Sequence, residues 1–133
     1  MIARTRLALS FALLLGLLAM APGCLTSEGY KDAVYGTYPR IADRLEKYPL
    51  TDSEAVDVAR LRTVSANRNA VTYDAAKPAW DASAPTYREK IATDESLSAP
   101  LKREYLYTAD GIDRLQRAEE LYRDTLGLVR PQP

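Results

Sequence analysis

The chain has 133 residues, 18 basic and 18 acidic side chains, one cysteine and no histidine. This length suits a single domain, and the balanced charge excludes a strongly basic surface for nucleic acids. A single cysteine excludes a disulfide within the chain, and the lack of histidine excludes imidazole catalysis, histidine metal ligands and a histidine pH switch.

The N-terminal 23 residues have the pattern of an export signal. Arg4 and Arg6 provide a positive start, and residues 7–21 carry no charge. This apolar run is shorter than the roughly 20 residues of a membrane-spanning helix, and its length and flanks are typical of a secretory signal peptide. Because the uncharged stretch continues to Ser27, an uncleaved anchor is the alternative.

The only cysteine, Cys24, directly follows this run, in the sequence Ala21-Pro22-Gly23-Cys24. Residues 1–24 thereby resemble the signal of bacterial lipoproteins, in which a small residue precedes the cysteine that receives the lipid. Gly23 and Cys24 match, whereas Ala21 stands where the family usually has leucine. The resemblance implies cleavage before Cys24 and attachment of its thiol to lipid, such as palmitate, at a membrane of the bacterial cell envelope.

Leu25 bears on which membrane would hold the protein. In the resembling lipoproteins of enteric-type bacteria, an aspartate after the cysteine retains the protein at the inner membrane. Leu25 is not that aspartate, so the resemblance favours the outer membrane where one exists.

The segment after the signal predicts an all-α fold. It shows no sustained alternation of apolar and polar residues and no hairpin turn between β-branched runs, whereas helical periodicity is clear. We expect a short tether at residues 24–29 and then a helical domain at residues 30–133, built as an antiparallel bundle of three or four helices.

The first helical segment lies within residues 30–48. Its apolar residues are spaced by three or four, as on one face of a helix: Tyr30, Val34, Tyr38, Ile41, Leu45 and Tyr48. Thr37 as a cap and Pro39 in the first turn predict a helix at 38–47, after a looser helical turn. Pro49 ends it, because a residue before proline avoids the helical conformation.

The second helix has the clearest start in the chain. Thr51 and Glu54 form a capping box, and we expect the helix to run over residues 52–76 and to stop before Pro78. Arg68 interrupts its apolar stripe, which comprises Val58, Leu61, Val64, Val71 and Ala75. A structural ion pair with Glu119 across the bundle is the main interpretation of Arg68; the alternative is an anionic ligand.

The two remaining helices are expected at residues 84–92 and 100–126. The segment 77–83, which contains Trp80, is expected to be a connection. Ser98 caps the last helix, which has a heptad-like stripe: Leu101, Tyr105, Thr108, Ile112, Leu115, Glu119, Tyr122, Leu126 and Val129. Its outer face offers i, i+4 ion pairs: Asp110–Arg114, Asp113–Arg117 and Glu119–Arg123. A homo-oligomer through residues 100–129 is therefore a candidate.

No pattern in the chain points to catalysis. A serine nucleophile needs a base, and neither S-x-x-K nor G-x-S-x-G occurs. The glycines are scattered rather than gathered in a phosphate loop, and the acidic pairs do not match a calcium loop. We expect no enzyme, no cofactor and no metal.

Tyrosine is the unusual feature of the composition, with all nine tyrosines after Cys24. Most should replace phenylalanine as core residues. Tyr35 lies off the apolar stripe, so we expect it to be exposed, and with Arg68 and Trp80 it forms a candidate interaction surface. Tyrosine and tryptophan combine an apolar body with a polar tip that suits glycans or peptides.

These patterns lead to a main functional hypothesis and two alternatives. The main hypothesis is a non-enzymatic, lipid-anchored protein of the cell envelope that acts as a structural or interaction module, with a protein partner there and no nucleic acid. The first alternative is a small ligand- or glycan-binding lipoprotein that uses a Tyr/Trp-rich surface. The second is a self-associating assembly factor built on the last helix.

Overall fold

The computed structural model describes residues 27–125. This part of the chain contains five α-helices and no strand, which confirms the all-α expectation there. The helices, in chain order, are α2 (Ser27–Tyr35), α3 (Tyr38–Leu45), α4 (Asp52–Ala66), α5 (Tyr73–Thr93) and α6 (Ala99–Thr125).

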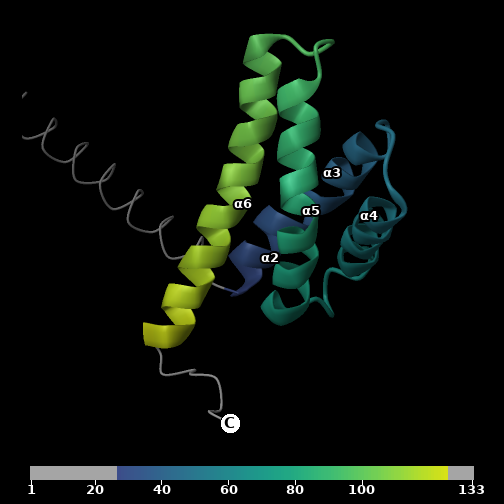
Figure 1. The fold of residues 1–133 in the computed structure, drawn as a ribbon. Helices are drawn as coiled ribbons and strands as arrows, with labels where there is room; N and C mark the ends of the chain where they lie inside the picture. Colours follow the sequence, from purple (N-terminus) through teal and green to yellow (C-terminus); the bar gives the residue numbers. More distant parts are fainter. Residues whose placement is uncertain (1–26, 126–133) are drawn as a thin grey trace, which may run out of the picture.

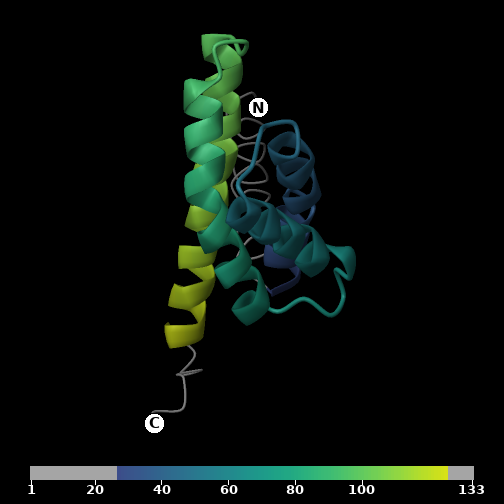
Figure 2. The same cartoon turned by 45° about the vertical axis from the view of Figure 1, so that its right-hand side comes forward.

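The helices form two layers. The long helices α5 and α6 run side by side as an antiparallel hairpin (Figures 1 and 2). The three shorter helices α2, α3 and α4 form the second layer against it, with α4 packed on α5 and α2 packed on α6. The first two helices are joined by a tight turn, in which a Cβ on Gly36 would lie 3.0 Å from the carbonyl oxygen of Asp32.

The apolar stripe predicted for residues 30–48 is confirmed. Its first five residues are buried and Tyr48 is half-buried. The helical turn expected before residue 38 is a regular helix, α2, and α3 has proline in its first turn as predicted. Thr37 differs from the prediction, because its side chain makes no cap and its hydroxyl donates to the carbonyl oxygen of Ala33.

The capping box of the second helix is present as predicted: Thr51 accepts from the backbone of Glu54, whose side chain accepts from the backbone of Thr51. The predicted length is wrong, because α4 ends at Ala66 rather than at residue 76. Asn67 terminates the helix in a non-helical conformation, and Thr72 caps a new helix by accepting from the amide of Ala75. Asparagine and threonine favour such ends because their side chains bond to the backbone.

The prediction of a connection at 77–83 and a short helix at 84–92 is also wrong. Helix α5 continues through Pro78 and Pro85. A proline inside a helix removes one hydrogen bond and costs about 3 kcal/mol. Both prolines here are exposed, and they stand seven residues apart, so they share one face and the carbonyl groups that they leave unbonded lie toward water. The opposite face buries Trp80 and Tyr87, and this burial favours the helix.

The last helix is confirmed, with Ser98 at its start accepting from the amide of Leu101. Within residues 101–119 its stripe packs inside the fold, since Ile112 and Glu119 are buried and the other apolar members are half-buried. It therefore forms no continuous exposed seam there. Tyr122, the next member, is exposed, and the members at 126 and 129 lie outside the described residues.

Two of the three ion pairs predicted along this helix form differently. Glu119 pairs with Arg123 as predicted, at 3.2 Å. Asp110 and Asp113 instead pair with Arg88 of α5, at 3.1 and 2.6 Å. These carboxylates connect two helices rather than two turns of one helix.

A continuous row of aromatic rings forms the centre of the core. Neighbouring ring centroids lie 5.8–6.3 Å apart, within the range of favourable aromatic pairs. Trp80, with no exposed surface, stacks on Tyr38 of α3 and donates its indole N–H to Asp113 of α6 at 2.8 Å. In order, the row is Tyr73, Tyr30, Tyr35, Tyr38, Trp80 and Tyr87.

Truncation of Trp80 should therefore destabilise the whole domain. We expect Trp80→Ala to lower the free energy of unfolding by about 3–5 kcal/mol, since it opens a large cavity. Trp80→Phe should cost less, about 1–3 kcal/mol, because it keeps a ring and loses mainly the hydrogen bond to a carboxylate. Urea unfolding followed by far-UV circular dichroism measures both. Equal midpoints for the wild type and Trp80→Ala would contradict this role.

Candidate functional site

The candidate interaction surface of Tyr35, Arg68 and Trp80 does not form. Tyr35 and Trp80 have no exposed surface, so the expectation of an exposed Tyr35 is wrong. Its ring contacts those of Tyr30 and Tyr38 at 5.9 Å, so it belongs to the aromatic row. Helix α2 therefore buries Tyr35 in addition to the residues of the predicted stripe, Tyr30 and Val34.

Arg68 is exposed and does not pair with Glu119. It lies in the loop after α4, where its guanidinium approaches the carboxylate of Asp32 at 3.7 Å, and these side chains are 54 and 85 % exposed. Glu119 is bound by Arg123 instead. The predicted pair fails because α4 ends at Ala66, which removes Arg68 from any helix face.

We expect Arg68→Ala to change the free energy of unfolding by no more than about 0.5 kcal/mol, because exposed ion pairs contribute little. The matched control is Arg62→Ala, which removes two closer ion pairs and should cost up to about 1 kcal/mol. Thermal or urea unfolding compares the two variants. A loss of several kcal/mol in Arg68→Ala would restore the view of a buried structural pair.

A cavity of about 260 Å³ lies between α3, α5 and α6. Its wall combines two arginines, two tyrosines, two threonines, one isoleucine and one glutamate: Arg40, Arg44, Tyr87, Tyr105, Thr37, Thr108, Ile41 and Glu104. Apolar and polar side chains are mixed in this wall, and the volume lies just below the roughly 300–1,000 Å³ of typical small-molecule sites, which suits a small ligand.

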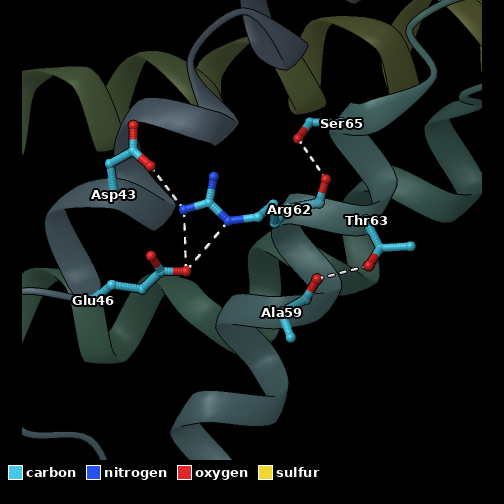
Figure 3. Close-up of polar contacts among 6 residues, drawn as sticks. All are labelled: Asp43, Glu46, Ala59, Arg62, Thr63 and Ser65. Carbon is cyan, nitrogen blue, oxygen red and sulfur yellow. Dashed lines mark hydrogen bonds and ion pairs between the residues drawn. The ribbon is translucent and has the colours of Figure 1, made fainter.

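Arg44 differs from the other half-buried arginines of residues 27–125. Arg62, Arg88 and Arg123 are also half-buried, and each of them binds two carboxylates. Figure 3 shows this arrangement for Arg62, whose guanidinium lies between Asp43 and Glu46 at 2.7 and 3.0 Å. Arg44 has no carboxylate partner among the described residues.

The guanidinium of Arg44 is held in place by a tyrosine. Its carbon lies 4.6 Å from the centre of the Tyr105 ring, and one of its nitrogens donates to the Tyr105 hydroxyl. A guanidinium has five donors, so most of them stay available for a ligand. The same contact brings α3 to α6 at the cavity wall.

The polar groups around Arg44 leave the cavity with a small positive charge. Arg40 and Arg44 stand one helical turn apart on α3, against the single carboxylate of Glu104. Burial raises the pKa of Tyr87 to about 12, so its hydroxyl stays neutral near pH 7 and can donate or accept. The net charge at neutral pH is therefore one positive unit.

The pattern that would have indicated this site is present in the sequence. Arg44 is three residues from Ile41, so on a helix it lies at the edge of the apolar stripe. An arginine at such an edge buries its aliphatic stem and keeps its guanidinium near the surface, where a partner can reach it. The sequence alone did not show which helix would face it, because the position of Tyr105 depends on the packing of α6.

Other kinds of site are lacking in residues 27–125. No group of three metal-ligating side chains occurs there, and no described helix is long and apolar enough to cross a membrane. Three buried polar atoms in this region make no hydrogen bond: the hydroxyls of Tyr30 and Tyr35 and the amide nitrogen of Gln116. Comparison with protein-family models, curated proteins and solved structures gives no match to the chain.

Proposed function

We propose that this chain is a non-enzymatic, lipid-anchored protein of the bacterial cell envelope. Residues 1–23 would act as a cleaved signal peptide and Cys24 as the lipidated residue. The helical domain, an antiparallel bundle, would serve as a structural or interaction module at the membrane surface. The support from sequence is the uncharged run that ends at the single cysteine of the chain.

The observation that carries the placement of the domain at the membrane surface is the short distance along the chain from Cys24 to the folded domain. Helix α2 begins at Ser27, within the segment expected to be a tether. Three residues span at most about 10 Å. A lipid on Cys24 would therefore hold the domain directly against the bilayer, where it could contact other proteins of the same membrane but could not reach far from it.

The alternative of a ligand- or glycan-binding lipoprotein needs a different surface from the one expected. Tyr35 and Trp80 are buried, so they cannot bind a glycan from solvent. Among the described residues, Tyr87 and Tyr105 line the cavity between α3, α5 and α6. A ligand-binding activity would be located there, and it would be compatible with the membrane anchor.

Cys24→Ser tests the anchor. We expect this variant to lose all incorporation of a palmitate analogue and to accumulate as an unprocessed precursor, because the thiol is the nucleophile that accepts the lipid. The matched control is Cys24→Ser combined with Ser27→Cys, which keeps one thiol near the same place but outside the signal pattern. The control should also incorporate no lipid.

Crosslinking in native membranes tests the interaction module. The wild-type chain should yield a defined crosslinked partner of the envelope, and Cys24→Ser should lose it. Equal lipid incorporation by the wild type and Cys24→Ser would refute the lipoprotein proposal. An unchanged set of crosslinked products would refute the claim that the anchor determines the partner.

A further inference from the structure

We infer that the cavity between α3, α5 and α6 binds a small organic monocarboxylate through Arg44. This inference is independent of the membrane anchor. It starts from the one half-buried arginine in residues 27–125 that has no carboxylate partner, while its three counterparts each have two. The ligand would supply the carboxylate that the fold does not.

The geometry of Arg44 suits this ligand. A guanidinium binds a carboxylate through two parallel hydrogen bonds, and such pairs are stronger than neutral hydrogen bonds. The ring and the hydroxyl of Tyr105 hold the Arg44 side chain, so little rotamer entropy remains to be lost on binding. Arg40, one turn away on the same wall, adds a second positive charge.

The charge of the wall favours a monoanion over phosphate. Two guanidiniums face one carboxylate, that of Glu104, which leaves one net positive charge. A single carboxylate neutralises this charge. A phosphate dianion would leave one excess negative charge and would be repelled by Glu104. The side chains of Ile41 and Tyr87 provide apolar surface, which suits an organic body attached to the carboxylate.

The test uses the purified full chain and isothermal titration calorimetry with benzoate as the probe. Benzamide is the matched neutral probe, since it has the same ring without the charge, and inorganic phosphate tests for a general anion site. We expect benzoate to bind to the wild type and to Cys24→Ser alike. Benzamide and phosphate should bind about tenfold more weakly or worse.

Variants of Arg44 locate the binding. Arg44→Met keeps the aliphatic stem and should weaken benzoate binding about tenfold or more, which corresponds to about 1.4 kcal/mol. Arg44→Lys keeps the positive charge but lacks the two parallel donors of a guanidinium, so its affinity for benzoate should be intermediate. Arg60→Met is the control, because Arg60 is exposed on α4 and outside the cavity wall; it should bind like the wild type.

Several results would overturn the inference. Equal affinity for benzoate and benzamide would show an apolar cavity without charge recognition, and equal affinity for phosphate would show a general anion site. Unchanged benzoate affinity in Arg44→Met and Arg44→Lys, or no benzoate binding to the wild type, would also overturn it. Far-UV circular dichroism of each variant separates a lost site from a lost fold.

Discussion

The contact between Trp80 and Tyr38 is the interaction on which the rest of the structure depends. Trp80 has no exposed surface, and its ring stacks on Tyr38 with centroids 6.2 Å apart. Tyr38 in turn donates its hydroxyl to the carbonyl oxygen of Ala76, one turn before Trp80 on α5. The ring contact and the hydrogen bond from Tyr38 therefore both fix α3 against α5.

The indole nitrogen extends this contact to the third helix. It donates to Asp113 of α6, which also pairs with Arg88. Burial alone would raise the pKa of the Asp113 carboxyl. The hydrogen bonds from Trp80 and Arg88 outweigh burial and lower this pKa below its ordinary value. A carboxylate that binds two donors in this way stays charged at neutral pH and keeps the indole N–H satisfied. The three helices that surround the cavity are thus held by one small group of residues.

The half-buried arginines of residues 27–125 follow a common pattern with one exception. Arg62 connects α4 to α3, Arg88 connects α5 to α6, and Arg123 connects α6 to Asp74 of α5. Each of these arginines pairs with at least one carboxylate outside its own helix, and Arg123 also pairs with Glu119 of its own helix. Arg44 also crosses, from α3 to α6, but it finds a tyrosine. This exception leaves the cavity wall with one net positive charge, from Arg40 and Arg44 against Glu104.

The sequence predicted the elements whose signals are local. The capping box at Thr51, the stripe from Tyr30 to Leu45 and the long last helix are set by residues within a few turns of one another, and the structure contains them. The core role of most tyrosines also followed from their helical spacing.

The sequence failed where packing between distant segments decides the outcome. Helix α5 passes through two prolines because burial of Trp80 and Tyr87 outweighs the local preference against proline. The partners of Arg44, Asp110 and Asp113 lie on other helices, so no spacing along the chain could identify them. The position of Arg44 at the edge of an apolar stripe was visible in the sequence, but the walls of the candidate site were not, since they come from three helices.

The central claim is that the two layers form one cooperative unit around Trp80. Native-state hydrogen exchange tests it most directly, through the free energies of opening for the most protected amides of α3, α5 and α6. If the claim is right, these free energies are equal and match the free energy of global unfolding. An α3 that opens at a clearly lower free energy than α5 and α6 would contradict it, because the contact between Trp80 and Tyr38 would then not join the layers.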